Sequence, residues 1–318
     1  MSIHYFIIFP CHNDTTWADY WQLDTKTSFL YNYPMTKATP LMIQGTASGV
    51  GKTVLTMALC KIFNEDGYRV SPFKSQNITS NTAFTKNDDE IALSQMLQAW
   101  AAGAEPNVAM NPLVLKPLPE KRAWRIILNG KHYGDVSPAE FVKIKPGLIQ
   151  EVTNSYNELA NKSDIVVIEG AGSPAELNLN RDDIANMGMA KAANAPVILV
   201  ADIDRGGVFA SLYGTVNLLT ESERKHIKAT IVNRFKGDAS SFADGVSIIE
   251  EFTALPVLGV VPHILLDIPE EDALFGSNND SYQENRDLAD QFDLIAKTVR
   301  ESLDMELLYR ILKGGMEC

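Results

Sequence analysis

Ten residues, 44–53 (QGTASGVGKT), contain the residue types that bind a phosphate group. They follow a short apolar run at 41–43 and precede a stretch with helical periodicity at 54–60. In such a strand–turn–helix, backbone N–H groups and the helix N-terminus point at the anion. Lys52 can neutralise phosphate charge, and the Thr53 hydroxyl can ligate Mg²⁺. We therefore expect a nucleotide to be bound by Gly45, Thr46, Gly49, Val50, Gly51, Lys52 and Thr53.

The loop departs from the usual pattern G-x4-G-K-[ST] at its first position. Thr46 stands there, and the glycine comes one residue earlier, at Gly45. The alternative is a glycine-rich turn that binds nothing. The flanking strand and helix favour the nucleotide.

Glu169 and Lys74 are candidates outside this loop. Glu169 follows the apolar run 164–168 and precedes small residues, a setting that suits a Mg²⁺ ligand. The alternative is a solvated acid in a turn. Lys74 directly follows the predicted short strand at 69–73. A lysine at this place beside a phosphate site can bridge the γ-phosphate and an acceptor carboxylate. Its alternative is an ordinary surface lysine.

Two further apolar runs end in charged or amide side chains. Asp202, Asp204 and Arg205 follow residues 196–201, where they can bind substrate carboxylates or position the metal. A capped helix start with an internal ion pair is the alternative. Asn233 follows residues 229–232, and its amide can hydrogen-bond an adenine edge; the alternative is a polar turn.

The elements that must position these residues alternate along the chain. Six short segments, separated by helical patterns, are expected to be strands: 41–43, 69–73, 164–168, 196–201, 229–232 and 256–261. Those from 164–168 onward are apolar runs of the buried parallel type, and 69–73 is a short strand that includes Arg69 and Ser71. This alternation predicts an α/β fold with a doubly wound, mainly parallel sheet that binds ligands at the carboxyl ends of its strands. Residues 90–103 and 139–161 are expected to be helical, and 124–136 to form a β-hairpin turning at 129–130.

Composition narrows the function classes. The chain of 318 residues has a net charge of −12, which argues against nucleic acid as a partner. No run reaches the ~18 apolar residues that a membrane span needs. Three distant cysteines fit a reducing cytosol, so we expect a cytoplasmic protein. The histidines show no metal-ligand spacing.

The ends of the chain differ from its middle. Residues 1–37 form an atypical, aromatic-rich extension before the main domain, which we expect at 38–272. Residues 273–318 are predicted to be an acidic linker and a helix at 287–312. Six apolar residues of that helix are spaced so that they lie on one face: Leu288, Phe292, Ile295, Val299, Leu303 and Leu307. Such a face usually packs on a core, but it can also dock a partner.

Nine motifs occur here in a fixed order: QGTASGVGKT, PFKSQN, EIALSQMLQA, MNPLVLKP, EGAGSPAE, DIANMGMA, ADIDRGGVF, NRFKGD and PVLGVVP. Together they closely resemble the cobyric acid synthase family, the glutamine-dependent amidases of cobalamin biosynthesis. The resemblance runs from about residue 39 to 272. More distantly, the loop and EGAGS are similar to dethiobiotin synthetase, which implies a P-loop NTPase fold of that type.

The resemblance implies an activity. ATP phosphorylates side-chain carboxylates of a corrinoid, adenosylcobyrinic acid a,c-diamide, and ammonia then displaces phosphate to give cobyric acid. The implied cofactors are ATP and Mg²⁺, with Thr53 and Glu169 on the metal and Asn233 on the adenine. The implied catalytic residues are Lys52 and Lys74 at the phosphates, Glu90 in the metal or acceptor region, and Asp202, Asp204 and Arg205 near the acceptor.

One part of the family pattern is missing from these residues. Family members usually continue into a glutamine amidotransferase domain with a cysteine in a G-x-C-x-G elbow. None of Cys11, Cys60 and Cys318 lies in such an elbow. We therefore expect ammonia to come from a separate glutaminase chain or from solution, unless the sequence is a fragment. A homo-oligomer is also compatible with the family.

Other functions remain open at this stage. A cobyrinic acid a,c-diamide synthase or a dethiobiotin synthetase would activate a different carboxylate on the same fold. A partition-type ATPase switch carries a lysine early in the loop, where this chain has Ala47. A fragment that only binds nucleotide is the last alternative.

Overall fold

The computed structural model describes residues 38–177, 183–266 and 286–314. The predictions for an N-terminal extension at 1–37 and for an acidic linker beginning at 273 lie outside these residues. The proposed domain boundaries stay predictions.

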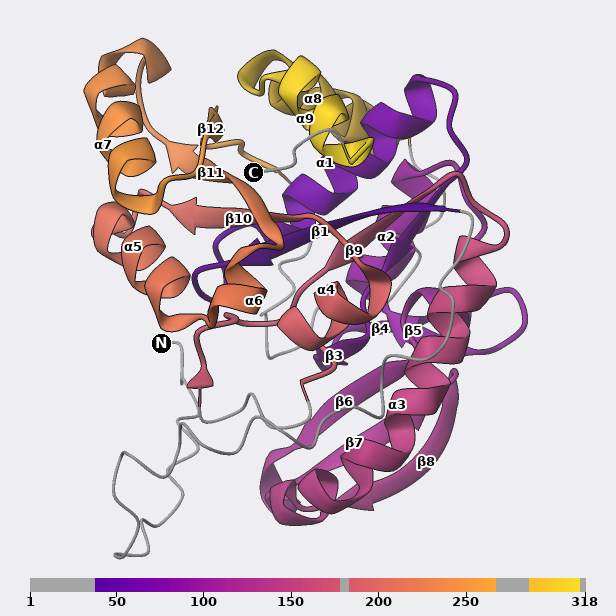
Figure 1. The fold of residues 1–318 in the computed structure, drawn as a ribbon. Helices are drawn as coiled ribbons and strands as arrows, with labels where there is room; N and C mark the ends of the chain where they lie inside the picture. Colours follow the sequence, from indigo (N-terminus) through magenta and orange to yellow (C-terminus); the bar gives the residue numbers. More distant parts are fainter. Residues whose placement is uncertain (1–37, 178–182, 267–285, 315–318) are drawn as a thin grey trace, which may run out of the picture. The chain divides into compact units, whose positions relative to one another are not determined.

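Six strands form the central sheet, and every neighbouring pair is parallel (Figure 1). Their order is β12-β11-β10-β1-β9-β2. Their bounds are β1 Thr39–Gly45, β2 Val70–Phe73, β9 Ile165–Glu169, β10 Val197–Asp202, β11 Ile227–Phe235 and β12 Val257–Pro262. Each of the six predicted segments is one of these strands, so the doubly wound parallel fold is confirmed.

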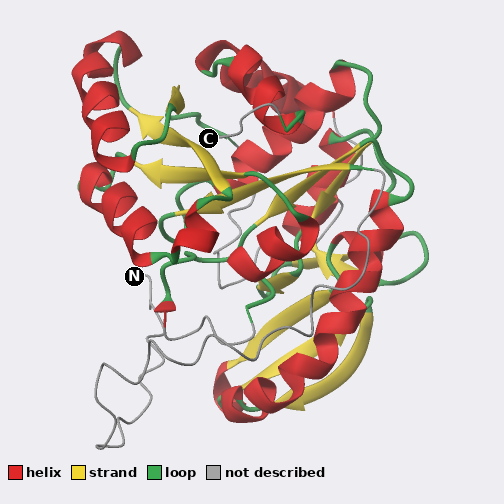
Figure 2. Ribbon diagram, viewed as in Figure 1, coloured by secondary structure: helices red, strands yellow, loops and turns green. Residues whose placement is uncertain are grey.

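Helices cover both faces of this sheet (Figure 2). Successive strand residues point to opposite faces, so Leu41 and Ile43 belong to one apolar core and Met42 to the other. The first core is shared with α1 (Lys52–Glu65), α2 (Leu93–Ala101), α8 (Arg286–Ser302) and α9 (Met305–Leu312). The second is shared with α3 (Pro138–Ala160), α4 (Met187–Ala193), α5 (Val208–Leu218) and α7 (Ala243–Thr253). A short helix, α6 (Glu221–Arg224), precedes β11, and 3₁₀ turns lie at Val108–Met110, Pro119–Lys121 and Ala239–Phe242.

A second sheet has the order β3-β6-β7-β8 and packs on α3. It comprises β3 (Gln76–Ile78), β6 (Leu113–Leu118), β7 (Ala123–Leu128) and β8 (Lys131–Val136). The predicted hairpin is confirmed as β7 and β8, and positive φ angles at Asn129 (48°) and Gly130 (77°) match a type I′ turn. Strand β6 was not predicted, because Pro117 and the polar residues after it obscure the strand pattern.

The predicted helix at 90–103 is wrong in its first turn. Glu90–Ala92 is strand β5, paired antiparallel with β4 (Thr82–Phe84), and α2 begins only at Leu93. Ala92 is extended, with φ −63° and ψ 139°. Tertiary pairing with β4 therefore overrides the helical composition of this segment.

The single helix predicted at 287–312 is in fact two helices, α8 and α9. The helix is interrupted before Asp304. The backbone N–H of Asp304 donates to the carbonyl of Leu258 in β12 (2.7 Å), and its side chain accepts from the N–H of Leu307 (2.8 Å), which caps α9. Five residues of the predicted apolar face lie in the core shared with α1, and Leu307 is only partly buried; the five are Leu288, Phe292, Ile295, Val299 and Leu303. The face proposed as a docking surface is therefore largely used inside the domain. None of the helices in the described ranges has the length and apolar character that a membrane crossing requires.

Candidate nucleotide site

The loop at residues 45–51 joins β1 to α1 and is tightly packed. A Cβ on Gly51 (φ 96°) would lie 2.1 Å from the amide nitrogen of Asn233, and one on Gly45 would lie 2.5 Å from Val50. Both positions therefore require glycine. The loop ends at the N-terminus of α1, where backbone N–H groups have no partners within the helix. This is the geometry expected for a phosphate-binding loop.

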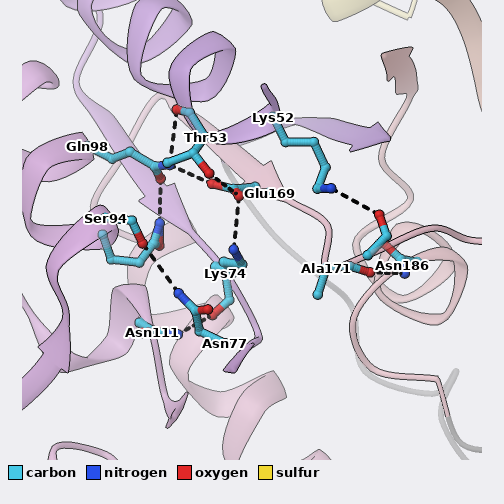
Figure 3. Close-up of polar contacts among 12 residues, drawn as sticks. Lys52, Thr53, Lys74, Asn77, Ser94, Gln98, Asn111, Glu169, Ala171 and Asn186 are labelled. Carbon is cyan, nitrogen blue, oxygen red and sulfur yellow. Dashed lines mark hydrogen bonds and ion pairs between the residues drawn. The ribbon is translucent and has the colours of Figure 1, made fainter. Parts of the chain in front are cut away.

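Lys52 connects this loop to the segment that follows β9. Its Nζ donates to the carbonyls of Ala47 and Gly172, at 3.0 Å each. The neighbouring carbonyl, of Ala171, accepts a 2.6 Å hydrogen bond from Asn186, so both carbonyls of this segment are held (Figure 3). The Lys52 ammonium is buried and lies over the loop, where it can neutralise phosphate charge.

Glu169 is the centre of the site. It ends β9, is fully buried, and accepts hydrogen bonds from the Thr53 hydroxyl (2.9 Å) and the Lys74 ammonium (2.9 Å) on Oε1. The amide of Gln98 donates to its other oxygen, Oε2 (2.6 Å). Because Phe73 pairs with Ile168, Lys74 and Glu169 come side by side at the carboxyl edge of the sheet. The structure thus brings together Thr53, Lys74 and Glu169.

The Glu169 carboxylate also affects the pKa of a nearby thiol, that of Cys60. Burial, and then the negative charge of Glu169, raise the pKa of the Cys60 thiol far above its ordinary value. Cys60 therefore stays protonated at neutral pH and has no thiolate to act as a nucleophile.

The donor set fits Mg²⁺ with a nucleotide. Thr53 and Glu169 supply oxygen atoms at one point, and Mg²⁺ in phosphate sites takes one or two protein oxygens and fills its shell with phosphate and water. Within the described ranges, no group of three or more His, Cys, Asp or Glu side chains can hold a metal.

Asp202 ends β10 and belongs to a separate ionic cluster. Its buried carboxylate contacts Arg234 (3.1 Å) and Arg205 (3.4 Å), while Asp204 pairs with Lys236 (2.7 Å). The hydrogen bond from Lys236 lowers the pKa of the Asp204 carboxyl. The internal ion pair weighed as the alternative for Asp202 and Arg205 is therefore observed, and their role at the acceptor stays a prediction.

Asn233 lies against the phosphate loop. Its side-chain amide donates to the carbonyl of Val50 (2.8 Å), a contact that supports the loop from β11. Its proposed contact with adenine stays a prediction.

Glu90 lies in a different cluster from Glu169. It forms an ion pair with Lys116, and the Thr82 hydroxyl donates to it at 2.6 Å. Burial raises the pKa of Glu90, but hydrogen bonds from Lys116 and Thr82 outweigh burial and leave the pKa below its ordinary value. The hydrogen bonds of Glu90 thus connect it to β4 and β6, and its place in the metal or acceptor region stays a prediction.

Three buried amides of the site were not predicted: Gln98, Asn111 and Asn186. Asn111 donates to the carbonyl of Lys74 (3.0 Å) and accepts from the N–H of Ala92 (3.2 Å), so it connects the residue that follows β2 to the end of β5. A signal for Gln98 existed, because two glutamines stand three residues apart in a helix that is otherwise apolar except for Ser94. Asn111 and Asn186 lie in the MNPLVLKP and DIANMGMA motifs but show no local pattern that marks their contacts.

Comparison with known proteins agrees with the motifs. A family model described as an AAA domain matches residues 39–269. A cobyric acid synthase from Ruminiclostridium cellulolyticum is 51% identical over 237 residues, covering 74% of this chain and 46% of the relative. One from Streptococcus sanguinis is 50% identical over 234 residues, covering 74% and 47%. The chain spans about half the length of the curated relatives it matches.

Solved structures overlap more loosely. The MinD cell division protein of Aquifex aeolicus has a TM-score of 0.39 at 17% identity, over 71% of this chain and 83% of MinD. The receptor FtsY of Elizabethkingia anophelis, in complex with GDP, has a TM-score of 0.40 at 17% identity, over 71% and 57%. Overlaps this low carry no information on function. The family-model match shows that the chain belongs to the AAA-domain family, and its similarity to cobyric acid synthases confirms the resemblance carried by its motifs.

Proposed function

We propose that this chain activates corrinoid carboxylates for amidation in the cytoplasm. A side-chain carboxylate oxygen of adenosylcobyrinic acid a,c-diamide attacks the γ-phosphorus of ATP, the bond to the bridging oxygen breaks, and ADP leaves. Ammonia then attacks the acyl carbon, the carbon–oxygen bond breaks, and phosphate leaves with one proton of the ammonia. Repetition at further side chains gives cobyric acid.

The observation that carries the proposal is the buried Glu169 carboxylate between Thr53, at the start of α1, and Lys74, directly after β2. Transfer of a phosphoryl group depends mainly on alignment and on neutralising charge. Three positions supply charge or metal ligation at one edge of the sheet: Lys52, Lys74, and the Thr53–Glu169 oxygen pair. The names of the similar proteins supply the substrate class.

Each of these residues has a proposed task. Lys52 binds the phosphates, and Lys74 orients the acceptor carboxylate toward them. Thr53 and Glu169 would hold Mg²⁺, which when bound supplies positive charge at the phosphate oxygens. Asn233 binds the adenine. The acceptor is placed by Asp202, Asp204 and Arg205, with Glu90 in the metal or acceptor region.

The test is an amidation assay with the purified chain, ATP, Mg²⁺, the a,c-diamide and ammonium chloride, read by mass spectrometry of the corrinoid. Ammonium is the nitrogen donor, so the assay does not depend on a glutaminase. We expect the mass of the corrinoid to change by the conversion of one carboxyl group to an amide for each carboxylate that reacts. Turnover should fall by about 100-fold or more in Lys52→Ala.

Lys61→Ala is the matched control, because Lys61 also lies on α1 but forms partly exposed ion pairs with Glu65 and Asp293. It should keep turnover near that of the parent chain. Absence of amide with ammonium, together with ADP release on cobyrinic acid or 7,8-diaminopelargonate, would replace the proposed substrate by that of the corresponding synthetase.

Glu169→Gln tests the metal assignment. The substitution keeps the side-chain size but removes the charge that attracts Mg²⁺. We expect turnover to require a higher Mg²⁺ concentration while the far-UV circular dichroism spectrum stays unchanged. An unchanged Mg²⁺ dependence would remove Glu169 from the metal site.

A further inference from the structure

Two glutamines of α2 are buried where apolar side chains would be expected. Gln95 and Gln98 are both 0% exposed, while Leu93, Leu97 and Ala101 of the same helix belong to the apolar core. Burying an amide costs free energy unless it is hydrogen-bonded. Because packing alone would favour leucine or methionine at these positions, the amides call for another explanation.

Gln98 closes a ring of contacts with the phosphate loop. Its Nε2 donates to Oε2 of Glu169 (2.6 Å) and also lies 3.4 Å from the carbonyl oxygen of Thr53. The hydroxyl of Thr53 donates in turn to Oε1 of Glu169 (2.9 Å). Gln98 therefore contacts both Thr53, in the first turn of α1, and the Glu169 carboxylate that Thr53 faces (Figure 3).

The orientation of the Gln98 amide follows from these partners. An ionised carboxylate only accepts hydrogen bonds, so Gln98 must present its NH₂ group to Glu169. Its carbonyl then faces away and accepts from the amide of Gln95. Gln95 must likewise point its NH₂ group inward, and its own Oε1 has no hydrogen-bond partner among the described residues. The two amides thus have a single direction, set by the carboxylate.

We infer that Gln98 is a positioning residue for Glu169. It donates to Oε2, while Thr53 and Lys74 donate to Oε1, and Gln95 donates to the carbonyl of the Gln98 amide. In this way α2 selects which carboxylate oxygen is presented to the metal and phosphates. The inference rests on the nucleotide-binding part of the proposed function and does not require the corrinoid.

The test measures ATP binding to the full chain by calorimetry, first in EDTA and then across a Mg²⁺ titration. Gln98→Met keeps the length of the side chain but removes the donor. We expect its ATP affinity in EDTA to stay within about twofold of the parent, and its apparent Mg²⁺ affinity to fall about tenfold, as for a lost hydrogen bond to a charged group.

Gln95→Met is the matched control: the same helix, the same burial and the same chemical change, but no hydrogen bond to Glu169. Its apparent Mg²⁺ affinity should change by less than about threefold, because the carboxylate itself still orients Gln98. Equal Mg²⁺ effects in the two variants, or equal losses of ATP affinity with and without Mg²⁺, would overturn the inference in favour of a general packing role.

A second variant keeps the test decisive if Gln98→Met does not fold. Gln98→Asn retains the amide but shortens the side chain by one methylene, so that its NH₂ group no longer reaches Oε2 and the Mg²⁺ response should again weaken by about tenfold. A Mg²⁺ response like that of the parent chain in this variant would refute the role. Since the assay contains no corrinoid, failure of amidation and failure of this inference are separate results.

Discussion

Lys74 and Glu169 form an ion pair that can be tested through stability. Their side chains are 5% and 0% exposed, and Nζ lies 2.9 Å from Oε1. Removing one partner of a buried pair leaves an uncompensated charge and costs about 3–5 kcal/mol. In Lys74→Met, Thr53 and Gln98 still donate to the carboxylate, so we expect the lower end, about 3 kcal/mol.

Removing both charges should reverse much of this loss. Replacing a whole buried pair by neutral groups of similar volume is often neutral or stabilising. Lys74→Met with Glu169→Gln should therefore unfold within about 1 kcal/mol of the parent chain, although each single variant loses about 3 kcal/mol. The assay is urea unfolding of all four proteins, followed by circular dichroism and fluorescence and compared at equal denaturant slope.

The same two strands provide a matched control at their opposite ends. Arg69 precedes β2 and Asp164 precedes β9, and they form an exposed ion pair with Nη2 2.6 Å from Oδ1. Because water already solvates both charges, Arg69→Met should lose far less stability than Lys74→Met. A loss below about 1 kcal/mol for Lys74→Met, or a double variant no more stable than the singles, would refute the buried-pair argument.

Three further predictions concern the loop and the surface. Gly51→Ala should cost about 1–3 kcal/mol from backbone strain and sharply weaken ATP binding in calorimetry. Gly67→Ala is the control: Gly67 also has a positive φ (90°) but has open space around it, so this variant measures the cost of backbone strain without crowding. Asn233→Ala should reduce the preference for ATP over GTP; equal weakening of both nucleotides would exclude adenine recognition. Hydrogen bonds from Arg69 lower the Asp164 pKa from 3.8 to about 2, so this stabilisation is complete above pH ~4 and lost as the pH falls through about 2. The melting-temperature difference between the parent chain and Asp164→Asn should shrink over that range.

The central sheet and the phosphate loop are readable from local sequence. A buried parallel strand favours apolar residues, and each of the six predicted segments became a strand, including 69–73 with its interior Ser71. The loop needs glycine where φ is positive or the backbone is crowded, and Gly45 and Gly51 stand at two such points. The hairpin turn at Asn129-Gly130 follows from the same local chemistry.

Local patterns failed where pairing with another element decides the conformation. Glu90 begins a helical-looking segment, yet it is held as a strand by pairing with Phe84. The helix expected through residue 304 breaks because Asp304 donates to Leu258, a residue far back in the chain. In both places a backbone hydrogen bond to another element outweighs the helix propensity of the segment.

By itself, then, the sequence determined which strands form the sheet and that a phosphate loop opens α1, because both depend on neighbours a few residues apart. Only the tertiary structure decided which side chains meet there. Glu169 meets Thr53, Lys74 and Gln98 across 116, 95 and 71 residues of chain. Contacts over such separations arise from strand order and helix packing. The contact of the buried Gln98 with Glu169 could therefore be recognised only in the folded structure.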